Sequence, residues 1–100
     1  MARDLYRYMF AAQTALDDVE ASLLLAIWGT ESLHGESQVR LDASHFLDAE
    51  KRACVIDAGT PVGRDLNRLF VGYLRREFGD QFRVEHLGDT EPAQAEEVGA

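Results

Sequence analysis

The sequence predicts an α+β fold, a two-layer sandwich in which two helices cover one face of a four-stranded antiparallel sheet. Two observations lead to this prediction. Hydrophobic residues alternate with period two in four short segments and recur at helical spacing in two longer ones. Along residues 5–87 these segments follow one another as strand, helix, strand, strand, helix and strand. Because strand–helix–strand crossovers are right-handed, both helices are expected on the same face of the sheet.

The first strand is predicted over residues 5–12, where every second residue from position 6 to position 10 is aromatic. Thr14 is a residue type that caps helix N-termini, and Asp17 and Asp18 follow it at positions where carboxylates favour a first turn. The sequence therefore predicts a helix that begins at Thr14 and continues to about Leu33.

Residues 39–58 are predicted to form a hairpin, with strands over 39–47 and 53–58 and a polar turn between them. Thr60 then suits the N-cap of a second helix, and Pro61 suits its first position, where a missing N–H group has no cost. This helix is expected to end near Phe78, before a glycine, and to be followed by a last strand over residues 82–87.

A chain of 100 residues is close to the most common size of one domain. We predict a single α+β domain over residues 1–87. Residues 88–100 are rich in Pro, Ala and Glu and contain almost nothing to bury, so they predict a disordered acidic C-terminal tail.

The order of elements resembles the ferredoxin-like architecture, written βαββαβ. A hairpin can place the third strand between the first two, which gives the antiparallel order 4-1-3-2 with both helices on one face. The resemblance concerns the order of elements and not a sequence motif. It implies a fold and no particular activity, because many unrelated functions use this architecture.

The net charge of −8 excludes several classes of partner. Such a charge repels phosphate backbones and anionic lipids, so we expect no nucleic acid and no membrane among the partners. The longest apolar stretch, residues 23–28, is too short to cross a bilayer, and the first residues do not resemble a signal peptide. We therefore expect a cytoplasmic protein. No phosphate-binding loop and no spacing of metal ligands stands in the sequence, so no cofactor and no metal are expected.

One edge of the predicted sandwich gathers polar residues from three segments. The candidate ligand-binding residues are Asp57, Gly59, Thr60, Arg64, His34 and His86. The N-terminus of the second helix presents free N–H groups there, which can hold a small anion. The same residues also suit simple capping of the helix, so a structural role is the alternative. At the opposite edge, Asp17 and Asp18 are expected near two arginines at positions 75 and 76.

The leading hypothesis for function is a small non-enzymatic module that self-associates and binds a protein or a small ligand. Its open sheet face is expected to mix apolar and charged residues and to be buried in a homodimer. The residues predicted on this face are Leu5, Arg7, Met9, Ala11, Arg40, Asp42, Val55 and Arg83. The alternative is a small-molecule enzyme with a pocket at the sheet/helix edge near the Asp57–Thr60 turn, whose catalytic residues the sequence does not identify.

Overall fold

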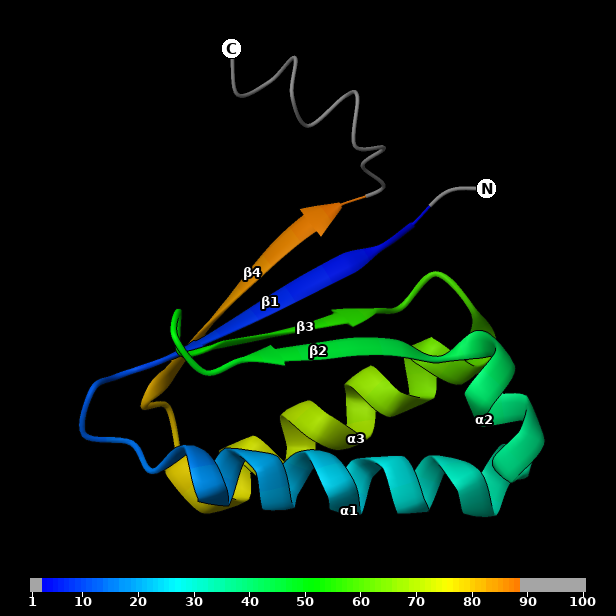
Figure 1. Ribbon diagram of the computed structural model, residues 1–100, viewed down its shortest axis with the longest axis horizontal. Helices are drawn as coiled ribbons and strands as arrows, with labels where there is room; N and C mark the ends of the chain where they lie inside the picture. The colour runs from blue at the N-terminus through cyan, green and yellow to red at the C-terminus, as the bar shows by residue number, and fades with distance from the viewer. Residues whose placement is uncertain (1–2, 89–100) are drawn as a thin grey trace, which may run out of the picture.

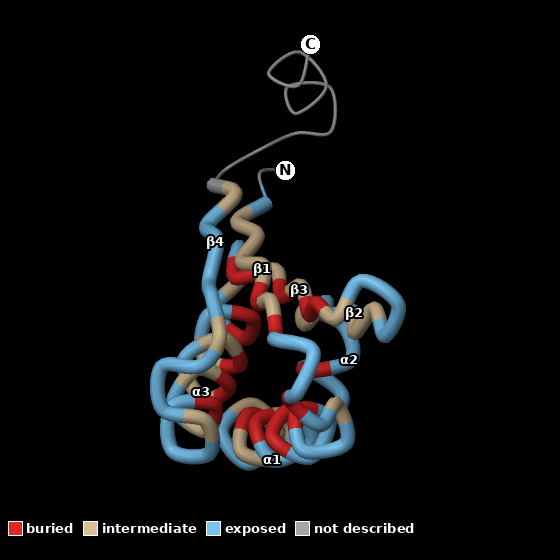
Figure 2. The backbone as a smooth tube through the Cα atoms, turned by 90° about the vertical axis from the view of Figure 1, so that its left-hand side faces the viewer, coloured by how far each residue is buried: buried red, intermediate tan, exposed pale blue. Residues whose placement is uncertain are grey.

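A computed structural model describes residues 3–88 of the chain. Its elements are β1 (Leu5–Phe10), α1 (Leu16–His34), α2 (Glu36–Asp42), β2 (Ser44–Asp48), β3 (Ala53–Asp57), α3 (Pro61–Phe78) and β4 (Phe82–Gly88). The four strands form one antiparallel sheet in the order β2-β3-β1-β4. Figure 1 and Figure 2 show α1 and α3 against the same face of the sheet, and in Figure 1 the two helices run in opposite directions and cross obliquely. The predicted α+β class and its two layers are confirmed.

The core lies between the sheet and the two long helices (Figure 2). Tyr8 is opposite Cys54 in the register of β1 and β3, and both side chains are buried on the helix side. The ring of Tyr8 meets the ring of Phe70 edge-on, with centroids 4.9 Å apart. The alternation of the strands therefore sends one set of side chains into the core and leaves the other set on the open sheet face.

The predicted second helix is α3, and its ends agree with the sequence. Thr60 is the N-cap, and its hydroxyl accepts a hydrogen bond of 2.9 Å from the N–H of Gly63. Pro61 occupies the first turn, and Gly79, with φ of 65°, ends the helix. A positive φ is a conformation that glycine adopts without the steric cost that a side chain brings.

The predicted strand over residues 39–47 is wrong in its first half. Residues Glu36–Asp42 form the short helix α2, and β2 begins at Ser44. Helical spacing is stabilised by two side-chain pairs four residues apart: Arg40 with Glu36 at 3.0 Å, and Gln38 with Asp42 at 2.5 Å. Val39 and Ala43 are four residues apart and share one side of this helix, whereas Leu41 lies on the opposite side and is 78% exposed. Arg40 and Asp42 therefore lie on α2 and not on the sheet face.

The N-cap of the first helix lies one residue later than predicted. It is Ala15 and not Thr14, and no side chain caps the helix. The guanidinium of Arg52 donates hydrogen bonds to the carbonyl oxygens of Ala11 and Thr14. These bonds fix the segment between β1 and α1 in a turn conformation. Thr14 is buried in this segment, and the helix starts at Leu16. Because β1 also ends earlier than predicted, at Phe10, Ala11 belongs to this connection and not to the sheet face.

The C-terminal strand extends to Gly88, one residue past the predicted boundary of the domain. The rest of the predicted acidic tail, 89–100, lies outside the described residues. Within residues 3–88, none of the helices combines the length and the apolar character needed to cross a bilayer.

Candidate functional site

The turn between β3 and α3 is held by its own polar side chains. One carboxylate oxygen of Asp57, Oδ1, accepts hydrogen bonds from the N–H of Gly59 at 2.9 Å and from the N–H of Asp4 at 3.1 Å. The hydroxyl of Thr60 donates to the carbonyl oxygen of Asp42 at 3.0 Å, in addition to accepting from Gly63. The turn is therefore fastened to β1 on one side and to the end of α2 on the other.

A first group of polar residues, the strand-end cluster, surrounds Asp57 at the open end of the sheet. It consists of Arg3, Asp4, Tyr6, Asp57 and His86. Nε2 of His86 lies 2.5 Å from Oδ1 of Asp4, and the imidazole stacks on the ring of Tyr6 with centroids 4.3 Å apart. Nε of Arg3 lies 3.6 Å from the second oxygen of Asp57. These contacts join the start of β1 to the ends of β3 and β4.

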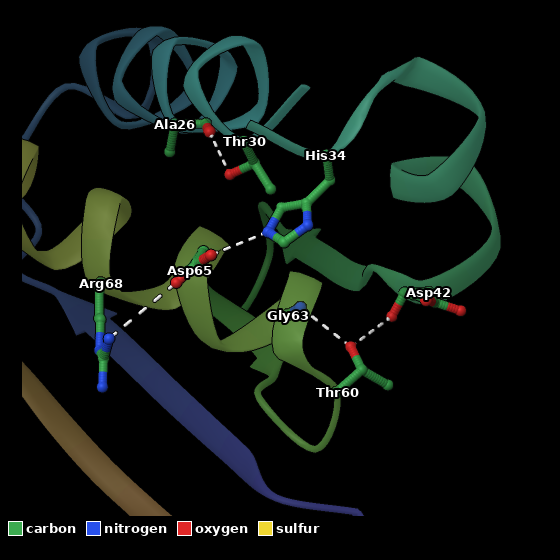
Figure 3. Close-up of polar contacts among 8 residues, drawn as sticks. All are labelled: Ala26, Thr30, His34, Asp42, Thr60, Gly63, Asp65 and Arg68. Carbon is green, nitrogen blue, oxygen red and sulfur yellow. Dashed lines mark hydrogen bonds and ion pairs between the residues drawn. The ribbon is translucent and has the colours of Figure 1, made fainter. Parts of the chain in front are cut away.

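A second group, the helix-junction cluster, lies where α1, α2 and α3 meet. Figure 3 shows its members His34, Asp42, Thr60, Asp65 and Arg68. Nε2 of His34 lies 2.8 Å from one oxygen of Asp65, whose other oxygen is 4.0 Å from Arg68. His34 is the last residue of α1 and Asp65 belongs to the first turns of α3. The pair therefore ties the end of one long helix to the beginning of the other.

The predicted site is thus divided between these two groups. Asp57 and His86 lie in the strand-end cluster, where Gly59 also bonds, whereas His34 and Thr60 lie in the helix-junction cluster. Arg64 belongs to neither: it is exposed, and its guanidinium has no ion pair within residues 3–88. The six residues share one end of the molecule but do not converge on a single point.

The contacts of the histidines limit the chemistry that these groups can perform. In the part of the chain that the structure describes, His34 and His86 bond to carboxylates and not to a hydroxyl or thiol that they could activate. Burial raises the pKa of the Cys54 thiol to about 12, so this side chain stays protonated and unreactive at neutral pH. No grouping of three or more His, Cys, Asp or Glu side chains within residues 3–88 could hold a metal ion.

The outer face of α1 shows a feature that the sequence reasoning missed. Leu24, Leu25 and Trp28 lie within about one turn of each other on the side away from the core, and all three are exposed, Trp28 to 58%. The opposite side of the same helix is buried. Six consecutive apolar residues, 23–28, exceed what one buried face needs, and this excess was the available signal.

The outer face of α3 is basic. Arg64, Arg68 and Arg75 are exposed at helical spacing, and a hollow of about 300 Å³ lies beside them. It is lined by Arg68, Leu69, Gly72, Tyr73 and Arg76. The expected pairing of Asp17 and Asp18 with the arginines at the end of α3 is absent from the ion pairs of residues 3–88. Both sets of charges therefore face solvent.

The open sheet face agrees in part with the expected composition. Residues directly opposite each other in the ladder point to the same face, and one such row runs from Phe46 through Val55 and Arg7 to Glu85. Phe46 is 63% exposed and was not predicted there. The guanidinium of Arg7 forms an ion pair with Glu85 across this row. The face is apolar at its β2 edge and charged at its β4 edge.

In comparisons with known proteins, no protein-family model, no curated protein and no solved structure matches the chain.

Proposed function

We propose that this chain is a small, non-enzymatic, cytoplasmic binding module that associates with a second copy of itself. We also propose that its architecture is of the ferredoxin-like kind, with α2 as an addition between the first long helix and the hairpin. The free, buried thiol of Cys54 suits a reducing compartment such as the cytoplasm.

The observation that carries the proposal is the exposed apolar face of α1. Leu24, Leu25 and Trp28 form a contiguous group on one side of the helix. Single exposed apolar residues are ordinary on protein surfaces, but a group of large ones on one helix face is typical of a protein-binding site. Tryptophan is also among the residues that contribute most to binding energy when an interface buries them.

The open sheet face supports self-association as well, and it is the homodimer interface that the sequence predicts. Phe46 protrudes from β2 beside Val55, and Met9, two residues after Arg7 on β1, points to the same face. A twofold axis lying between two facing sheets would bury these residues in both copies. The ion pair between Arg7 and Glu85 occupies the rest of the face, which makes this surface more polar than the outer face of α1.

An enzyme with a pocket near the Asp57–Thr60 turn has less support. The carboxylate of Asp57 and the hydroxyl of Thr60 each make two hydrogen bonds that fasten the turn, and His34 and His86 each bond a carboxylate. A small anionic ligand at the N-terminus of α3 would compete with Thr60, which already accepts from the N–H of Gly63.

Sedimentation equilibrium of the full chain tests the proposal. We expect a monomer–dimer equilibrium. Replacing Leu24 and Trp28 by Gln should weaken it if the interface is the outer face of α1, whereas Phe46→Thr should weaken it if the interface is the open sheet face. Asp80→Asn, in the connection between α3 and β4, is a matched surface control. A wild-type chain that stays monomeric at the highest soluble concentration overturns the proposal.

A further inference from the structure

The outer surface of the two long helices is complementary to itself. We propose that in the dimer α1 of each copy packs on α3 of the other copy, around a twofold axis that runs parallel to α1. Trp28 of one copy then lies over Gly72 of the second copy. This inference rests on the proposed self-association and specifies its geometry.

The charges on the two helices supply the first argument. Asp17, Glu20 and Glu31 lie along the edge of α1 that is turned away from α3, since the opposite side of α1 places Gly29 against Leu69. Within residues 3–88 none of these three carboxylates has an ion pair. The surface of the helix layer therefore has an acidic edge.

The other edge of the same surface is basic. Arg64, Arg68 and Arg75 follow the outer side of α3, and only Arg68 has a carboxylate within 4.0 Å in the described part of the chain. The apolar face of α1 and the hollow beside Gly72 lie between the two edges. The order across the surface is acidic, apolar, hollow and basic.

This order selects one of the two simple ways to place a second copy face to face. A twofold axis in the interface, perpendicular to the helices, would set α1 on α1 and bring the acidic edges together, which is unfavourable. An axis parallel to α1 sets α1 on α3 and brings each acidic edge to a basic edge. The contact of α1 with α3 and the contact of the acidic edge with the basic edge each form twice, as an isologous dimer requires.

The axial register follows from one contact within the chain. A methyl group on Gly29 would lie 3.0 Å from Cδ1 of Leu69, so these two residues are at the same height along the helices. Rotation about an axis parallel to α1 preserves that height. Because α1 and α3 run in opposite directions, Trp28 comes to the height of Phe70 of the second copy (Figure 1). This height lies between Arg68 and Gly72.

The charged edges meet in the same register. Glu31 comes to the height of position 67 of the second copy, within about one helical turn of its Arg64 and Arg68. Glu20 comes to the height of position 78, within about one turn of Arg75. One rotation, fixed by a contact that has nothing to do with charge, therefore brings acidic side chains of α1 to the height of basic side chains of α3 toward both ends of the helices.

The surface beside Gly72 suits an indole ring. A Cβ atom added to Gly72 would meet nothing within 4 Å, so the helix backbone is open there. Leu69 and Tyr73 supply apolar walls to the hollow, and Arg68 and Arg76 flank it. An arginine beside an indole adds a cation–π attraction. Two helices side by side also present a plan area on the order of 500 Å², and the accessible surface of such a corrugated face is larger, near the ~800 Å² per partner of a standard interface.

Charge reversal on each edge tests this geometry. One variant carries Glu20→Arg and Glu31→Arg, and a second carries Arg68→Glu and Arg75→Glu. In the proposed dimer each variant alone places like charges on like charges, so its dissociation constant should rise on the order of tenfold or more. An equimolar mixture of the two variants places opposite charges together in both contacts, so a heterodimer should form with nearly the wild-type dissociation constant.

The outcomes separate this inference from the proposed function. A monomeric wild-type chain overturns both. A wild-type dimer that is unaffected by the reversal on α3 leaves self-association standing but overturns the pairing of α1 with α3, because a dimer through α1 alone or through the sheet does not use these arginines. Two weakened variants whose mixture does not recover a heterodimer also overturn it.

A measurement on the wild-type chain tests the same geometry even if the variants fail to fold. Trp28 is the only tryptophan in the sequence, so the intrinsic indole fluorescence reports on this position alone. On dilution through the dissociation constant measured by sedimentation, the emission maximum should move to longer wavelength as the ring becomes exposed to water. A constant emission maximum through that range of concentration overturns the placement of Trp28 in the interface.

Discussion

A methyl group on the α-carbon of Gly63 would lie 2.1 Å from the carbonyl oxygen of Asp57. The first turn of α3 therefore rests directly against the end of β3, and only a residue without a side chain permits this approach. The contact sets the position of Thr60, whose hydroxyl bonds the N–H of Gly63. The closeness of these two backbones explains why position 63, in the first turn of α3, is a glycine.

Gly63→Ala should lower the free energy of unfolding by about 1–3 kcal/mol, because the backbone of α3 or β3 must move to admit the methyl group. Gly72→Ala is the matched control: its Cβ meets nothing within 4 Å, and alanine favours a helix interior by about 1 kcal/mol over glycine. Urea denaturation at concentrations where the chain is monomeric measures both. If Gly63→Ala and Gly72→Ala changed the free energy of unfolding by the same amount in the same direction, the close approach at Gly63 would be contradicted.

Tyr8→Phe should destabilise the chain by about 1–2 kcal/mol. The hydroxyl of Tyr8 donates to Oδ1 of Asn67 at 2.5 Å, and removing it leaves the partly buried amide oxygen without this donor. Burial also raises the pKa of Tyr8, so the phenol stays protonated and remains a donor at neutral pH. Tyr73→Phe is the control, since no hydrogen bond of the Tyr73 hydroxyl is found within residues 3–88. Similar denaturation midpoints for both variants would argue against this role of Asn67.

Thr60→Val should cost about 1–2 kcal/mol of stability, because the N–H of Gly63 and the carbonyl of Asp42 both lose their partner. Thr60→Ser keeps the hydroxyl and should retain most of the stability. Thermal denaturation followed by circular dichroism compares the two variants. If serine is no better than valine, the methyl group of Thr60 matters more than its hydrogen bonds.

The sequence predicts the two long helices and the central strands because their signals are local. Thr60, Pro61 and Gly79 mark the ends of α3 by capping chemistry, and the aromatic alternation in β1 matches its buried face. The prediction is wrong over residues 39–43, where the alternating apolar residues match the period of a strand but the chain forms the end of α2. Pairs four residues apart, such as Glu36 with Arg40, favour the helix there.

The candidate site was less predictable than the fold. Alternation and order place His34, Asp57 and His86 at one end of the sandwich, but they do not say which carboxylate each side chain meets. Asp65, which bonds His34, and Asp4, which bonds His86, are exposed or half-buried residues with no pattern of their own. The apolar outer face of α1 was missed for a different reason. Periodicity identifies the buried stripe of a helix, but it does not show that a second side of the same helix is also apolar.

His45 should make the stability of the chain depend on pH below neutrality. Its imidazole lies on the helix side of β2, opposite the buried Ile56, and although much of the residue is exposed, loss of water around the ring lowers its pKa from the usual 6.5. Above pH 7 the ring is neutral in both states and has no effect. As the pH falls below 6.5, the unfolded chain binds a proton more readily than the folded chain, so folding becomes less favourable.

Wild type and His45→Gln should therefore have a constant difference in unfolding free energy above pH 7 and diverge between pH 7 and pH 5 in the direction that favours the variant. Urea denaturation across that range measures the difference. The pairs of His34 with Asp65 and of His86 with Asp4 are common to both proteins, so their contributions to stability cancel in the difference. Parallel stability curves down to pH 5 would show that the environment of His45 does not oppose protonation.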